Sequence, residues 1–280
     1  MRVLVTGAGG NIGRAVVGHL LECGDSVVGL SLEPADLPVS RLVVGSAGDP
    51  AVVADALGDG VDAVVHLAAR PSPDHGTPLE VFGDNTRATF VVLDEAARRG
   101  VRHLAFAGSY AMFGTAFSPH GAHPPYYPLD ERAPLQVADP YALSKQVDEA
   151  TGEMIARRYG AAVVSLRFPY TVGWDQLRRM AARVRADPAV TAQDSWSYLH
   201  VDDAAVAARL AVTVPGEGFH AVLLAAPETL APWPTEELIR RYHPDTPIRE
   251  PIPGRNTPID TSAATKLLGF HPTRHLEMQG

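Results

Sequence analysis

Cysteine and long apolar runs are the scarcest features of this chain. Cys23 is the only cysteine among 280 residues, so no disulfide can form within the chain. Such a chain suits a reducing compartment, and we expect a cytoplasmic protein. The N-terminal residues show no hydrophobic segment followed by a small-residue cleavage site, and no apolar run reaches membrane length. We therefore expect neither a leader nor a membrane span.

Clustered positive charge and convincing metal ligands are also missing. The formal net charge is −8 at pH 7 and there is no basic cluster, which argues against nucleic acid or an anionic membrane as partner. His120 and His123 have the spacing of metal ligands, but they lie in a proline-rich stretch without a third ligand. We predict no metal site.

What is present is a regular alternation of apolar runs and helical patterns through the first half. Apolar strands that alternate with amphipathic helices predict a parallel sheet covered on both faces, a doubly wound α/β fold of the Rossmann-like type. Ligands of such sheets bind at the carboxyl ends of the strands. The predicted strands are 3–5, 26–30, 42–44, 63–67, 104–107 and 162–166, and the predicted helices are 11–23, 51–57, 85–99 and 141–159.

A glycine-rich segment follows the first predicted strand and opens the first predicted helix. It reads TGAGGNIG over residues 6–13. Gly7, Gly10 and Gly13 permit a tight turn, close approach of the backbone to a pyrophosphate, and close packing of helix against sheet. The position directly after an N-terminal strand favours nucleotide binding.

Tyr141 and Lys145 lie four residues apart in the segment PYALSK. Residues at i and i+4 of a helix share one face, so the spacing brings an ammonium near a phenol. A free phenol has a pKa of about 10, and a nearby positive charge favours the phenolate. The pair therefore has the chemistry of a general acid or base. A helix face with a lysine lying beside a tyrosine is the alternative interpretation.

Together, these motifs resemble the extended branch of the short-chain dehydrogenase/reductase superfamily, the NAD-dependent epimerases, dehydratases and reductases. The glycine spacing is G-x-x-G-x-x-G, and Tyr141 and Lys145 match Y-x-x-x-K. The resemblance covers nearly the whole chain. Its other parts are HLAA at 66–69, Asn85 at the opening of the next helix, AGSYAMFG at 107–114 with Ser109 at the catalytic position, LRFP at 166–169, YLHVDD at 198–203 and KLLGF at 266–270.

The resemblance implies an NAD or NADP cofactor and a catalytic set of Ser109, Tyr141 and Lys145. Tyr141 would act as general acid or base on a substrate hydroxyl or carbonyl. Lys145 would lower the pKa of Tyr141 and hold the nicotinamide ribose, and Ser109 would orient the substrate oxygen. The cofactor contacts it implies are Gly7, Gly10, Asn11, Ile12, Gly13, Ser31, Ser46, Leu67, Ala68, Ala69, Asn85, Tyr141, Lys145, Phe168 and Pro169.

Two departures from the family pattern leave the choice between NAD and NADP open. Ser31 stands where NAD-preferring relatives carry an acidic residue for the adenosine ribose, which removes a carboxylate that would repel a 2′-phosphate. No arginine follows directly to bind such a phosphate, and Glu33 could still reach a ribose. Ser46 replaces an aspartate usual near the adenine.

Two further departures bear on the reaction. Tyr110 and Ala111 stand where sugar dehydratases carry an Asp-Glu pair, which argues against dehydration. Tyr170 replaces an asparagine usual in nucleotide-sugar epimerases, and a short segment separates Gly173 from Ser195. That segment carries four arginines, which could meet an anion or form a solvated helix face. These features favour a small or non-nucleotide substrate.

We therefore expect a dinucleotide-binding domain at 1–173, to which 195–226 returns, and a small substrate-binding region from 174–194 and 227–280. The loop 113–135 would lie near the site. The leading hypothesis is a dehydrogenase or reductase that transfers a hydride at a carbinol or carbonyl carbon of a small polar, sugar-like or natural-product substrate. The alternatives are an NAD-dependent sugar epimerase and a non-catalytic NAD(P)-binding protein. The resemblance also implies a homodimer formed through helices 85–99 and 141–159.

Overall fold

A seven-stranded parallel sheet runs through the computed structural model, which describes residues 1–58 and 60–276. The spatial order of the strands is β3-β2-β1-β4-β5-β6-β9, which confirms the doubly wound α/β fold. The strands are β1 (Arg2–Thr6), β2 (Ser26–Ser31), β3 (Arg41–Val44), β4 (Ala63–His66), β5 (His103–Ser109), β6 (Ala162–Phe168) and β9 (Gly218–Leu223).

The order of the strands reverses between β1 and β4, the place where doubly wound sheets bind ligands. Thr6 at the end of β1 pairs in register with Leu30 of β2 on one side and His66 of β4 on the other. Ser109 at the end of β5 pairs with Phe168 at the end of β6. The predicted site residues therefore gather along one edge of the sheet because the strands that carry them are parallel.

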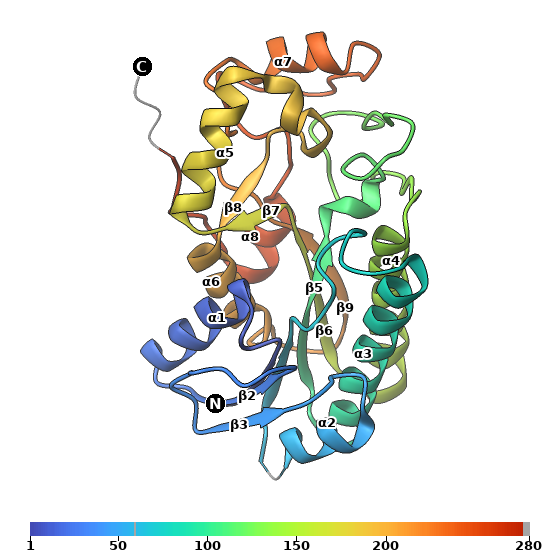
Figure 1. The fold of residues 1–280 in the computed structure, drawn as a ribbon, viewed down its shortest axis with the longest axis vertical. Coiled ribbons are helices and arrows are strands. Elements are labelled where there is room, and N and C mark those ends of the chain that lie inside the picture. Colours follow the sequence, from blue (N-terminus) through green and yellow to red (C-terminus); the bar gives the residue numbers. More distant parts are fainter. Residues whose placement is uncertain (59, 277–280) are drawn as a thin grey trace.

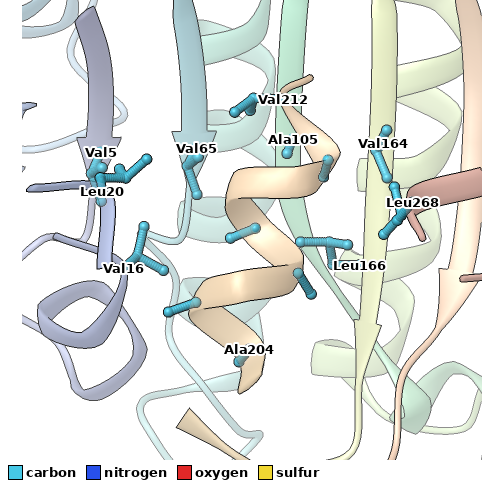
Figure 2. Close-up of a cluster of buried hydrophobic side chains, with 14 of the residues drawn as sticks. Val5, Val16, Leu20, Val65, Ala105, Val164, Leu166, Ala204, Val212 and Leu268 are labelled. Carbon is cyan, nitrogen blue, oxygen red and sulfur yellow. The ribbon is translucent and has the colours of Figure 1, made fainter. Parts of the chain in front are cut away.

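Helices cover both faces of the sheet (Figure 1). On one face lie α1 (Asn11–Glu22), α6 (Val201–Ala211) and α8 (Ser262–Leu268), and on the other α2 (Pro50–Leu57), α3 (Pro78–Arg98) and α4 (Pro140–Tyr159). Figure 2 shows α6 packed over the sheet with its axis running along the strands, and Val65, Ala105 and Leu166 among the side chains drawn beside it. Burial of apolar side chains on both faces stabilises the sheet as a rigid support for the strand ends.

A third apolar cluster lies beyond the carboxyl edge of the sheet. It joins the loop after β5 to α5 (Trp174–Ala186) and α7 (Thr235–Tyr242), with Trp196 fully buried at its centre. The small parallel sheet of β7 (Tyr170–Val172) and β8 (Tyr198–His200) lies next to α5 (Figure 1). Short 3-10 helices occupy Tyr110–Phe113 and Pro188–Asp194. The division into a dinucleotide-binding domain and a substrate-binding region stays a prediction. Helix α8 belongs by sequence to the substrate-binding region, but it packs into the apolar cluster on one face of the main sheet.

The structure differs from the sequence predictions at two helices. Helix α3 begins at Pro78 rather than at Asn85, because Thr77 and Glu80 form a reciprocal capping box and proline suits the first helical turn. Asn85 therefore lies in the second turn. The amphipathic helix α7 lies in the stretch 227–258, where no helix or strand is predicted from the sequence. In the described part of the chain, no helix is both long and apolar enough to cross a membrane.

Candidate active site

The glycine segment after β1 has a backbone that only glycine permits. Gly7 has φ +66°, in the left-handed region. Its carbonyl oxygen accepts a hydrogen bond from the N–H of Gly10 at 2.9 Å. A Cβ added at Gly13 would lie 2.1 Å from the carbonyl oxygen of Gly7, and one added at Gly7 would lie 2.7 Å from the nitrogen of Ala68. The turn, the helix and the loop after β4 are thus in direct backbone contact.

The N-terminus of α1 is open to an anion. Gly10 caps this 12-residue helix without a side-chain hydrogen bond, so no side chain covers the first-turn N–H groups of Asn11, Ile12 and Gly13. These N–H groups and the helix dipole favour a phosphate there. The cradle of three glycines and a free helix end fits the pyrophosphate of a dinucleotide.

Thr6 and His66 fix the loop after β4 against this cradle. Thr6 Oγ1 accepts hydrogen bonds from the N–H groups of Leu67 and Ala68, each at 3.3 Å, and lies 2.7 Å from Nδ1 of His66. His66 Nε2 lies 3.2 Å from the hydroxyl of Thr89 on α3. Burial, followed by the charge of Lys145, lowers the pKa of His66 to about 3. His66 is therefore a neutral bridge between β1 and α3.

Asn85 holds the same loop from the side of α3. Its Oδ1 accepts from the N–H of Arg70 at 2.7 Å, while its Nδ2 donates to the carbonyl of Arg70 at 3.2 Å and to Oγ of Ser144 at 3.1 Å. Both amide hydrogens are used within the protein. Asn85 thus links the cofactor-side loop, α3 and α4, while a direct contact with a cofactor stays a prediction.

Tyr141 and Lys145 lie in the first turns of α4 because the sequence starts a helix there. Asp139 caps the helix by accepting from the N–H of Ala142 at 2.9 Å, and Pro140 takes the first helical position. Lys145 is 3% exposed and donates to the carbonyl oxygen of Ala107 in β5 at 2.9 Å. Its ammonium lies 5.9 Å from the centre of the Tyr141 ring. The structure brings the predicted pair together on one helix face.

Ser109 ends β5, two residues after the carbonyl that binds Lys145. Its Oγ accepts from the N–H of Ala111 at 3.1 Å and the residue is 7% exposed. Phe117, from the loop 113–135, packs edge-on against Tyr141 with ring centres 5.9 Å apart. The loop therefore borders the Tyr141 side of the site, as predicted from its composition.

Phe168 ends β6 beside Ser109, and Pro169 follows it. The arginine of the LR motif does not face the site: Arg167 forms a bidentate ion pair with Glu149 of α4, at 2.8 and 2.7 Å. Glu149 also accepts from the hydroxyl of Ser165 at 2.8 Å. This buried pair anchors the helix that carries Tyr141 to the sheet.

At the adenosine end, Ser31 closes β2 and lies next to the glycine cradle. A Cβ added at Gly9 would lie 2.8 Å from Oγ of Ser31. Arg14, which the sequence analysis did not single out, donates to the carbonyl of Gly9 at 3.0 Å and to that of Asp36 at 3.1 Å. A basic residue therefore binds the backbone of Gly9, which lies next to Ser31, although it comes from α1 rather than from the segment after β2.

Ser46 lies at the surface, in a hollow of about 250 Å³ that Arg87 also borders. A larger hollow of about 530 Å³ lies between Arg157 and Glu217, at the amino end of the strands, and has no part in this site. Metal chemistry finds no support in the described residues, where no group of three or more His, Cys, Asp or Glu side chains could hold an ion. His123 instead bonds His243 at 2.8 Å.

Comparison with known families identifies this arrangement. The chain matches the sequence profile of the NAD dependent epimerase/dehydratase family over residues 3–224. It belongs to that family, which confirms the resemblance predicted from the motifs.

Curated relatives include epimerases and sugar dehydrogenases. A UDP-glucose 4-epimerase of Streptomyces lividans is 29% identical over 319 residues, covering 98% of this chain and 92% of the relative. A uronate dehydrogenase of Pseudomonas putida is 28% identical over 240 residues, covering 83% and 78%. A UDP-glucose 4-epimerase of Corynebacterium glutamicum is 30% identical over 179 residues, and this match spans 60% of the chain and only half (50%) of that protein.

Solved structures agree on the fold. A short-chain dehydrogenase/reductase superfamily protein of Agrobacterium tumefaciens with bound NAD superposes with a TM-score of 0.72 at 24% identity, covering 98% of this chain and 93% of that one. A UDP-glucose 4-epimerase of Bifidobacterium longum in complex with NAD+ and UDP has the same TM-score at 20% identity, covering 98% and 94%.

Proposed function

We propose that this protein is an NAD(P)-dependent oxidoreductase that transfers a hydride at a carbinol or carbonyl carbon of a small polar, sugar-like or natural-product substrate. The observation that carries the proposal is the Lys145 ammonium, held by β5 beneath the ring of Tyr141 and next to the strand end that carries Ser109. The nicotinamide, when bound, supplies the acceptor or donor of the hydride.

The roles of the side chains follow from their chemistry. Tyr141 takes the proton of a substrate hydroxyl in oxidation and returns it in reduction. Lys145 places its ammonium 5.9 Å from the centre of the Tyr141 ring, where it can hold the hydroxyl oxygen or the ribose of a bound cofactor. Ser109 donates a hydrogen bond to the same substrate oxygen and so orients the reacting carbon. Asn11, Ile12 and the three glycines of the loop would hold the pyrophosphate.

The substrate side favours a small polar molecule. Tyr170 stands in place of the asparagine of nucleotide-sugar epimerases, and burial raises its pKa while Arg179 and Arg183 oppose that rise. Two arginines therefore lie within electrostatic reach of the Tyr170 hydroxyl. A sugar or a sugar acid fits this environment, in line with the uronate dehydrogenase relative and with an L-arabinose 1-dehydrogenase (NAD(P)(+)) of Haloferax volcanii, 31% identical over 186 residues and covering 63% of this chain and 70% of that relative.

A panel of aldoses, uronic acids and UDP-sugars tests the proposal. Net formation of reduced cofactor in proportion to substrate supports a dehydrogenase. Interconversion of UDP-sugars without net reduction supports the second candidate, a sugar epimerase, which the relatives from Streptomyces and Corynebacterium favour. Tyr141→Phe should lower kcat about 10²- to 10⁴-fold. A variant as active as the wild type would leave only a non-catalytic NAD(P)-binding role.

We also propose a homodimer in the cytoplasm. Leu79 and Phe90 of α3 are 79% and 48% exposed and lie three turns apart on one face of the helix, where an apolar partner would cover them. Cys23, the only cysteine, is exposed and suits a reducing compartment. Light scattering of the protein and of Phe90→Glu tests the dimer, which the variant should weaken.

A further inference from the structure

Asp148 is a buried carboxylate for which the reaction outlined above has no use. It lies on α4, three residues after Lys145, and has no exposed surface. Its Oδ2 accepts from the Lys145 ammonium at 3.2 Å, whereas its Oδ1 has no hydrogen-bond partner among the residues that the structure describes. An ionised carboxylate out of contact with water is costly unless it is paired. Lys145 is its only direct ionic partner in the described chain.

The elements packed around this pair bring no competing charge from the sheet or from α3. From β4, His66 is neutral because its pKa is about 3. From α3, the uncharged hydroxyl of Thr89 lies 3.2 Å from Nε2 of His66. The same hydroxyl opposes the rise in the pKa of Asp148 by hydrogen bonding. From β5, the contact is the carbonyl of Ala107.

On α4 itself, Glu149 and Tyr141 are the other titratable groups near the pair. Glu149 is engaged by the bidentate ion pair with Arg167, and its charge is the smallest of the contributions that raise the pKa of Lys145. Tyr141 lies on the open side of the Lys145 ammonium. Asp148 is thus the one carboxylate that both touches Lys145 and lacks another cation among the described residues.

The electrostatic balance at Lys145 depends on this contact. Burial acts to lower the pKa of Lys145, but the Asp148 carboxylate, and after it Tyr141, more than offset that effect, so the pKa lies above its usual value. Burial likewise raises the pKa of Asp148, and the Lys145 ammonium opposes this rise. Without the carboxylate, desolvation at Lys145 would act against its charge.

We propose that Asp148 is a positioning residue whose carboxylate keeps the Lys145 ammonium charged and directs it toward Tyr141. An ammonium has three N–H donors. Ala107 takes one and Asp148 takes a second, both from the buried side. The third remains for the phenol of Tyr141 or for the ribose of a bound cofactor. This inference rests on the proposed function, because it assigns Lys145 a role in the reaction.

The lysines of this chain make a direct test possible, since Lys145 and Lys266 are the only two. Carbon-13-labelled lysine would give two side-chain NMR signals, assigned with Lys266→Arg, and the exposed Lys266 is the internal reference. The wild-type Lys145 signal should titrate at higher pH than the Lys266 signal. In Asp148→Asn, which keeps the size of the side chain, the Lys145 midpoint should fall by about one pH unit or more.

Activity gives a second measurement. The alkaline limb of the pH profile should move to lower pH in Asp148→Asn, because Lys145 loses its proton sooner. Asp25→Asn is the matched control: Asp25 is also buried and paired, with Arg209 at 2.8 Å, but it lies at the amino end of the sheet. The control should leave the Lys145 signal and the pH profile unchanged.

The outcomes separate this inference from the proposed function. An unchanged Lys145 midpoint in Asp148→Asn, or a wild-type Lys145 that titrates below Lys266, would overturn the inference. If Asp148→Asn does not fold, the comparison of the Lys145 and Lys266 midpoints in the wild-type protein decides the question. Tyr141→Phe tests the proposed function: full activity in that variant would reject catalysis by Tyr141, whatever Asp148 does to Lys145.

Discussion

The two ends of the site are built differently. At the reacting end, Lys145 and Asp148 are 3% and 0% exposed, and every polar link from Thr6 through His66 to α3 is made within the protein. At the adenosine end, Ser46 and Arg14 lie at the surface, and Arg14 is held by two backbone carbonyls. In the proposed function, the fold fixes the groups that would move protons, whereas a few side chains at the rim would govern the choice of cofactor.

This difference has a physical reason. A buried polar group that loses its partner is costly, so changing one member of the reacting end disturbs its neighbours. An exposed side chain at the rim exchanges water for a ligand at little cost to the fold. Substitutions should therefore affect stability and rate at the reacting end, and cofactor affinity alone at the adenosine end.

The largest effect is expected for Glu149→Gln. The substitution leaves Arg167, 6% exposed, without its counter-ion, and broken buried pairs cost about 3–5 kcal/mol. Urea unfolding would measure the loss. Glu153→Gln on the same helix is the matched control, because Glu153 and Arg157 form an exposed pair that contributes little. Equal losses in both variants would contradict the contrast between buried and exposed pairs.

Ser109→Ala should lower kcat about 10²- to 10³-fold, equivalent to about 2.7–4 kcal/mol, because the substrate oxygen loses a fixed donor. The affinity for NAD(P), measured by calorimetry without substrate, should stay within a factor of about two, since Ser109 lies at the reacting end. A loss of cofactor affinity that matches the loss of kcat would place Ser109 in cofactor binding instead.

The neutral His66 predicts a dependence of stability on pH. Because its pKa is lowered to about 3, the unfolded state binds more protons than the native state between about pH 3 and 6.5. The free energy of unfolding should therefore fall as pH falls through that window, by about 2 kcal/mol from this group by pH 5. Unfolding of His66→Asn over the same range is the comparison, and parallel pH curves would show that His66 is not responsible.

Ser31→Asp should have the smallest effect on the reaction rate and act chiefly on cofactor choice, although Ser31 is only 9% exposed. The new carboxylate can accept from the ribose hydroxyls and repels a 2′-phosphate, so the ratio of NAD to NADP affinity should rise about tenfold, near 1.4 kcal/mol. Arg14→Ala should move the same ratio in the same direction by weakening NADP. If the ratio of NAD to NADP affinity is unchanged in both variants, neither Ser31 nor Arg14 takes part in discriminating between the two cofactors.

Local signals made most of the fold predictable. The strands and helices predicted up to residue 166 lie within two residues of their predicted bounds, with α3 as the exception. Apolar runs that are buried on both faces, caps such as Asp139, and glycines at turns are short-range features that a sequence displays. Helix α3 was placed too late because the Thr77–Glu80 box lies before the apolar pattern begins.

The supporting network was less visible. The i, i+3 spacing of Lys145 and Asp148 was available in the sequence as a signal, but it cannot distinguish a buried ion pair from a solvated one. Thr89, Arg14 and Glu149 join elements that are remote in the chain, and nothing local distinguishes them from ordinary helix residues. Their partners become evident only when the sheet has assembled.

The sequence by itself determined the parallel sheet, because apolar periodicity encodes it locally. The glycine spacing and the family resemblance predicted the phosphate cradle and the set of Ser109, Tyr141 and Lys145, whose roles stay a proposal. The tertiary structure decided that Asp148 is buried against Lys145, that His66 is neutral and that Arg14 binds the carbonyl of Gly9. Burial and pairing arise between segments far apart in the chain, and the charge of a titratable group depends on both.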